Sequence, residues 1–131
     1  FTLDDALSES IRLTKPGTLI AVISDFSNVS AQSEKYLSKL SQHNELLLIH
    51  TFDPLEYALP NKGIYPVSDG HETLVVDTEQ DALQDNFKAY ITKKRSYLKH
   101  LAVKLRAPLI ELSTDIPAVN SIQNLLFSLQ R

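Results

Sequence analysis

Three runs of consecutive apolar residues, rich in leucine and β-branched side chains, stand out along the chain. They are Thr18–Ser24 (TLIAVIS), Glu45–Phe52 (ELLLIHTF) and Leu109–Leu112. A continuous apolar run of this length is typical of a strand that is buried on both faces, as in a parallel sheet. We therefore expect three parallel strands in this order, with helices on both faces of the sheet.

Between these runs, apolar residues recur every three or four positions, which is the period of an amphipathic helix. The predicted helices begin at about residues 3, 31, 79 and 117 and end at about residues 14, 43, 106 and 129. Thr2 and Asp5 have the spacing of a capping box, and Pro16 with Gly17 ends the first helix. Since parallel strands need crossover connections, the pattern predicts a three-layer α/β fold.

A β-hairpin is predicted between the second strand and the long helix. Ile64–Val67 and Thr73–Val76 are short apolar runs that flank Ser68, Asp69 and Gly70. An Asp-Gly pair between two such runs favours a tight turn. We expect this hairpin to be an insertion in a single domain over residues 1–131, since the sequence contains no linker or repeat.

Composition and charge limit which kinds of site and which kinds of partner the chain can have. The chain has no Cys, which excludes disulfides and thiolate zinc sites. Its net charge of −3 gives no reason to expect nucleic acid as a partner. Residues 1–92 hold 14 acids and 6 bases, a net of −8, whereas residues 93–131 hold 2 acids and 7 bases, a net of +5. An acidic body with a basic patch suits docking to a charged protein surface, although a solvated basic helix face explains the same pattern.

The lengths of the apolar runs and the identity of the first residue bear on where in the cell the protein lies. None of the runs approaches the ~18 residues of a membrane-spanning helix, so we expect a cytoplasmic protein without a membrane segment in this chain. Because the sequence opens on Phe1 and contains no Met, we expect it to be a piece of a longer chain, which a segment outside it could tether to a membrane.

An acid follows each predicted strand: Asp25, Asp53 and Asp115. In parallel α/β sheets, ligands bind beyond the carboxyl ends of the strands. Carboxylates and nearby hydroxyls such as Ser27 are the oxygen ligands that Mg²⁺ prefers. Asp and Ser are also common after strands because they start turns and cap helices, so both interpretations stay open.

Other kinds of chemistry lack their motifs. The chain has no Gly-rich phosphate loop and no G-x-S-x-G elbow, and its four His residues do not have zinc-binding spacings. We expect His50, inside the second strand, to be a core or sheet-face residue. The sequence therefore does not predict a complete catalytic site within this chain.

Five short segments together resemble a known bacterial family. They are Ile23–Phe26 after Pro16-Gly17, Asp53–Glu56, Leu59-Pro60 with Gly63, Val76–Thr78, and Leu112–Asp115. The combination resembles the carboxyl-terminal half of the family known as domain of unknown function fifty-eight. Its members look like von Willebrand factor A domains, which are Rossmann-like, and are often encoded beside MoxR-type AAA+ ATPases.

This resemblance implies a metal-ion-dependent adhesion site built from three segments. Asp25 and Thr2 match two of its ligand positions, although helix capping explains Thr2 equally well. The first segment, an aspartate-x-serine-x-serine, is expected before Phe1. We therefore expect this chain to bind Mg²⁺ poorly or not at all.

The resemblance favours a protein-interaction module, an adaptor for a MoxR-type ATPase or a recruiter of its substrate protein. Candidate partner-binding residues are Asp53, Glu56, Asp115 and Ser27; alternatively, Asp53 and Glu56 cap their turn and pair with Lys62 or Arg12. A competing hypothesis is a Mg²⁺-dependent phosphoryl hydrolase that uses the three strand-end aspartates.

The uncharged strand Thr18–Ser24 raises a separate expectation about self-association. In the von Willebrand arrangement its neighbour lies in the missing half, and the strand contains none of the Lys, Pro or bulges that protect natural sheet edges. We expect a homodimer that pairs this edge with its mate, or an edge that the hairpin of residues 64–76 covers.

Overall fold

The computed structural model describes residues 1–56, 64–68, 70–71, 73–77 and 81–129. The chain divides into two compact units, Phe1–Phe52 with Leu98–Arg131, and Asp53–Tyr97. The long helix α3 (Asp81–Leu105) contributes residues to both units. The single domain expected over residues 1–131 stays a prediction.

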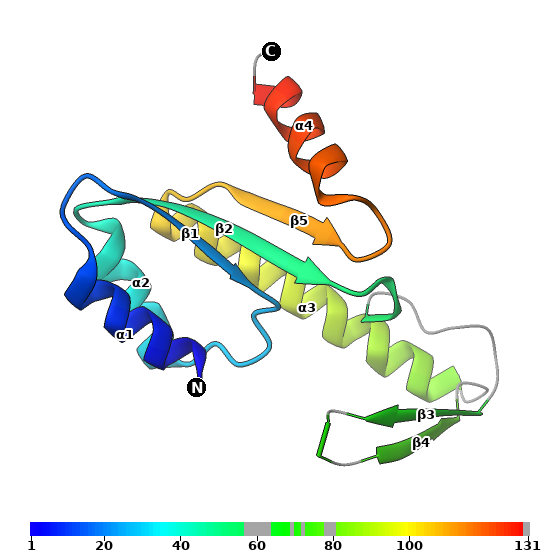
Figure 1. Cartoon of the computed structure of the whole chain (residues 1–131). Helices are drawn as coiled ribbons and strands as arrows, with labels where there is room; N and C mark the ends of the chain where they lie inside the picture. The colour runs from blue at the N-terminus through cyan, green and yellow to red at the C-terminus, as the bar shows by residue number, and fades with distance from the viewer. Residues whose placement is uncertain (57–63, 69, 72, 78–80, 130–131) are drawn as a thin grey trace. The chain divides into compact units, whose positions relative to one another are not determined.

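The first unit is built on a parallel sheet (Figure 1). Its strands β1 (Leu19–Ser24), β2 (Glu45–Phe52) and β5 (Leu109–Ser113) lie in the order β1-β2-β5. Leu19 is level with Glu45, and Leu48 is level with Leu109. The α/β class, the strand order and the parallel direction predicted from the sequence are confirmed.

Capping side chains start the first two helices. The Thr2 hydroxyl accepts a hydrogen bond from the Asp5 N–H at the start of α1 (Leu3–Leu13), and Ser30 does the same for the Ser33 N–H at the start of α2 (Ala31–Ser41). Both caps are reciprocal, because the Asp5 and Ser33 side chains accept from the cap residue's own N–H. The capping box predicted at Thr2 is confirmed. A fourth helix, α4 (Ala118–Leu129), follows β5.

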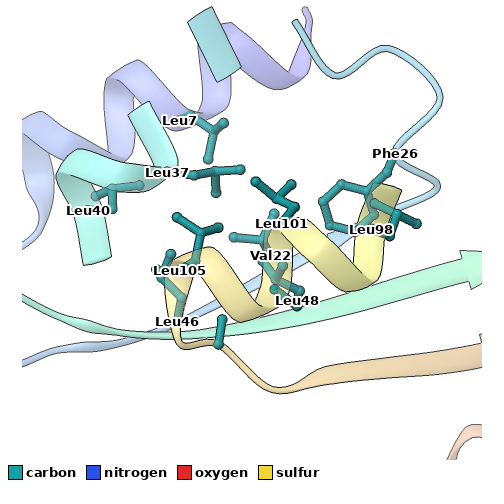
Figure 2. Close-up of a cluster of buried hydrophobic side chains, with 12 residues drawn as sticks. Leu7, Val22, Phe26, Leu37, Leu40, Leu46, Leu48, Leu98, Leu101 and Leu105 are labelled. Atoms are coloured by element: carbon teal, nitrogen blue, oxygen red, sulfur yellow. The ribbon is translucent and has the colours of Figure 1, made fainter. Parts of the chain in front are cut away.

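The main core lies between one face of this sheet and the helices α1, α2 and the carboxyl-terminal part of α3 (Figure 2). Leu37 of α2 and Leu48 of β2 are both 0% exposed at its centre. The other core side chains belong to the same elements and their connections: Leu7, Val22, Phe26, Leu40, Leu46, Leu98, Leu101, Ala102, Leu105 and Ala107. Their burial supplies the hydrophobic stabilisation that holds the layers together.

The opposite face of the sheet is covered unevenly. Ile23, Ile49 and Ile110 form one row across it, and their exposed fractions are 66%, 8% and 6%. Helix α4 contacts β5 and lies on the side of the sheet away from α1 and α2 (Figure 1). The row is therefore buried at β5 and β2 but open to solvent at β1.

This arrangement corrects the prediction that Thr18–Ser24 is buried on both faces. The outward side chains Leu19 and Ile23 are 64% and 66% exposed, whereas the inward Val22 is 7% exposed. Within the described part of the chain, β1 pairs only with β2 and is an edge strand. The apolar run is continuous although only one face of the strand is buried.

The second unit contains the predicted hairpin. Strands β3 (Ile64–Ser68) and β4 (Thr73–Asp77) pair antiparallel, with Ser68 level with Thr73. Gly70 in the connection has a φ of +94°, a conformation that favours glycine; Asp69 lies outside the described residues. A short 3₁₀ helix, η1 (Pro54–Glu56), begins the unit. None of the helices in the described residues is both long and apolar enough to cross a bilayer.

Candidate functional site

The loop after β1 presents Asp25 on a fixed backbone. Phe26 has a φ of +51°, which is unusual for a bulky residue, and its side chain is only 4% exposed in the core. The Phe26 N–H donates to the Ser24 hydroxyl at 3.0 Å, and the Ser27 N–H donates to Asp25 Oδ1 at 3.0 Å. The buried ring therefore anchors the loop, while Asp25 and Ser27 are exposed.

His50 supports this anchor from β2. Its side chain is 0% exposed, and its ring lies 6.2 Å from the Phe26 ring and 5.5 Å from the Phe52 ring, between centroids. The prediction of a core histidine is confirmed. The contact with Phe26 joins the loop to the neighbouring strand.

The other two strand-end aspartates also take part in turns. Asp53 Oδ1 accepts a hydrogen bond from the Leu55 N–H at 2.9 Å, across Pro54. Asp115 accepts one from the Ser113 hydroxyl. Both residues are exposed. Asp25 and Asp115 belong to the first unit, at the carboxyl ends of β1 and β5, and Asp53 begins the second unit.

The Thr2 hydroxyl is used by the helix cap. It donates to Asp5 Oδ2 at 2.9 Å and accepts from the Asp5 N–H at 3.2 Å, and the Thr2 N–H donates to Asp5 Oδ2 at 2.7 Å. These bonds from the Thr2 backbone and side chain lower the pKa of Asp5 below its usual 3.8, because they favour the charged carboxylate.

The donor set of the described residues fits a divalent cation only in part. Asp25, Ser27 and Thr2 offer the oxygen atoms that Mg²⁺ prefers. In the described ranges, however, no three His, Asp or Glu side chains come together in a group that could hold a metal ion. The metal-binding roles of Asp25 and Thr2 and the adhesion site itself stay predictions.

Asp4 is the site-adjacent residue that the sequence did not reveal. Its carboxylate accepts hydrogen bonds from the Ser30 hydroxyl at 2.9 Å and the Ser33 hydroxyl at 2.5 Å. These bonds join the start of α1 to the start of α2, three residues beyond Ser27. Ser30 and Ser33 have the spacing of a helix cap, so the start of α2 can be predicted from the sequence. Their hydrogen bonds to Asp4 cannot, because Asp4 lies more than twenty residues earlier in the chain.

The structure bears on the predicted ion pairs of Asp53 and Glu56 only through Arg12, one of their two predicted partners. Arg12 forms an ion pair with Glu9 of its own helix at 3.1 Å. Lys62 and the side chain of Glu56 lie outside the described residues. Contact of Asp53, Glu56, Asp115 or Ser27 with a partner stays a prediction.

Comparison with known proteins gives one match. No curated protein and no solved structure matches the chain. The model of a family described as "Protein of unknown function DUF58" matches residues 2–97. The match includes α1, β1, α2, β2, the hairpin and the first part of α3, and it ends before β5. Because it covers most of the sequence, the chain belongs to the DUF58 family.

Proposed function

We propose that this chain is a protein-interaction module that docks partners at the carboxyl ends of its parallel strands. The observation that supports the proposal most is the exposed Asp25 on a loop held by the buried Phe26. A preorganised loop loses little conformational entropy on binding, which favours affinity. An exposed carboxylate in such a loop can accept charge-assisted hydrogen bonds from Arg or Lys of a partner.

The proposed partner is a MoxR-type AAA+ ATPase or its substrate protein. This step rests on family membership and on the association with MoxR-type ATPases that the resemblance of Ile23–Phe26 and Asp53–Glu56 to the family implies. In the proposed role, the module connects a substrate protein to the ATPase and performs no chemistry of its own. The incomplete oxygen donor set leads us to propose that Mg²⁺ contributes little to docking by this chain alone.

Copurification tests this function. A tagged chain is mixed with a purified MoxR-type ATPase, and the retained ATPase is quantified. We expect retention by the unmodified chain, loss with Asp25→Ala, and no change with Asp85→Ala, an exposed aspartate of α3. Equal retention by the unmodified chain and both variants would contradict docking at the Asp25 loop.

A Mg²⁺-dependent phosphoryl hydrolase is the second candidate. The position of Asp25 and Asp115 at the same edge of one parallel sheet favours it. A panel of phosphomonoesters with Mg²⁺ distinguishes the two functions, since an adaptor gives no turnover. Turnover that is lost in Asp25→Ala would favour the enzyme.

We also propose that β1 pairs with β1 of a second copy. Leu19, Ala21 and Ile23 alternate with Ile20 and Val22, so the first three share the exposed face. An antiparallel pairing centred on Ala21 places Leu19 of one copy opposite Ile23 of the other, on the same face. Large side chains then flank a pair of alanines, and the free edge gains backbone hydrogen bonds.

A further inference from the structure

Adjoining hollows on the first unit form an open groove around α2, the end of α3 and the starts of β1, β2 and β5. Its parts share lining residues, with Gln42 and Lys104 common to two of them and Arg106 and Pro108 common to another two. The largest part has a volume of about 820 Å³, large enough to hold several side chains of a ligand. We name this hollow the basic groove.

Positive charge dominates the lining of the basic groove. Five exposed cations contribute to it, from α2 and from the end of α3: Lys35, Lys39, Lys99, Lys104 and Arg106. The lining acids are Glu34 and Glu45, and Glu34 already pairs with Lys104 at 3.7 Å. The groove is thus cationic in a chain whose net charge is −3.

Apolar side chains lie open in the same lining. Leu19 is 64% exposed in the part next to β1, and Val103 is 78% exposed in the part next to α3. A ligand that covers them gains hydrophobic stabilisation in addition to ion pairs. The groove therefore matches a ligand that carries acidic and apolar groups together.

We propose that the basic groove binds an acidic segment of a partner protein, one in which acidic and apolar side chains are interspersed. Charge complementarity between the groove and the segment carries the proposal. Duplex DNA and an anionic membrane extend far beyond the groove and meet the net negative charge of the whole chain, which disfavours both, whereas a short acidic segment lies within the groove. Where the groove meets the sheet, it lies at the starts of β1, β2 and β5, whereas Asp25 follows the end of β1, so this surface is additional to the docking edge.

Fluorescence anisotropy with synthetic peptides tests the proposal. The probe is a labelled peptide of alternating Glu and Val, and the comparison peptides carry Gln or Lys in place of Glu. The variant Lys35→Glu/Lys39→Glu reverses two groove charges on α2. The matched control, Lys88→Glu/Lys93→Glu, reverses two exposed charges of α3 that do not line the groove. A thermal melt checks folding, and Lys35→Gln/Lys39→Gln replaces the reversal if that variant does not fold.

We expect the Glu peptide to bind, and to bind at least about tenfold more weakly to the groove variant than to the control. Raising the salt from about 0.05 M to about 0.5 M should weaken binding further. The Gln and Lys peptides should bind weakly or not at all. No binding of the Glu peptide, equal binding by the two double variants, or tighter binding to duplex DNA or phosphatidylglycerol vesicles would overturn the proposal.

Discussion

Among single residues, Asp4 forms a hydrogen-bonded link between the first turns of α1 and α2. It accepts hydrogen bonds from Ser30 and Ser33, and Ser33 is 0% exposed. A hydrogen bond to a charged group contributes about 1.5–3 kcal/mol, and a buried partner left alone costs more than an exposed one. Asp4 is therefore expected to stabilise the fold although it lies at the surface end of α1.

A double-mutant cycle measures this link. We expect Asp4→Ala and Ser33→Ala each to lower the free energy of unfolding by about 1–2 kcal/mol. The double variant should lose about 1 kcal/mol less than the sum of the two, because both changes remove the same bond. Urea unfolding of the four proteins gives the values. Strict additivity would show that the two side chains do not interact in solution.

The capping box at Thr2 predicts a pH dependence. The pKa of Asp5 is lowered below 3.8 in the folded chain, first by the hydrogen bond from the Thr2 backbone. Its contribution to stability is therefore complete above the pKa of the unfolded chain and is lost as the pH falls through the lowered pKa. The melting-temperature difference between the unmodified chain and Asp5→Ala should shrink between about pH 5 and about pH 2. A difference that grows towards acid would contradict the assignment.

Among the strands, β1 and β2 are neighbours but differ sharply in how much the burial of their leucines contributes to stability. Leu48 on β2 is 0% exposed, and Leu19 on β1 is 64% exposed. We expect Leu48→Ala to cost about 2–5 kcal/mol of unfolding free energy. Leu19→Ala should cost no more than about 1 kcal/mol, even when Leu19 pairs with Ile23 of a second copy. The two variants make the same chemical change, so each is the control for the other. A large cost for Leu19→Ala would show that a further element covers β1.

The elements themselves were largely predictable from the sequence, because their signals are local. Thr2 with Asp5, Pro16 with Gly17, and the hairpin flanking Gly70 each act within a few residues. Coverage of the sheet was not predictable in the same way. A continuous apolar run looks the same in the sequence whether helices cover one face of the strand or both. The helix on the outer side of the sheet, α4, begins more than ninety residues after β1, so no local pattern shows how far it covers the sheet.

Some features of the candidate site also follow from local sequence, and others depend on the fold. The turn roles of Asp25, Asp53 and Asp115 follow from their positions after strands. The Asp4–Ser33 bond and the basic groove join segments that are far apart in the chain, such as Lys39 and Lys104 in the groove. Only the fold brings these residues together, so no spacing in the sequence indicates them.

At the scale of the whole molecule, the exposed edge of β1 predicts self-association. Ile23→Lys places a charge on the outer face at this edge, which disfavours strand pairing between copies. We expect light scattering to show a dimer for the unmodified chain and a monomer for Ile23→Lys. Leu13→Lys, at a residue of α1 that is 71% exposed, is the control and should stay dimeric. A monomeric unmodified chain at high concentration would contradict the pairing.

We propose the Asp25 loop as the docking surface for a MoxR-type ATPase. Isothermal titration of the chain into that ATPase, in Mg²⁺ and again in EDTA, tests it most directly. We predict measurable binding in both conditions and at least about tenfold weaker binding by Asp25→Ala. The melting temperature of that variant should fall only slightly, because Asp25→Ala removes an exposed hydrogen bond from the Ser27 N–H. Binding that Asp25→Ala leaves unchanged, or no binding by the unmodified chain, would show that the Asp25 loop is not the docking surface.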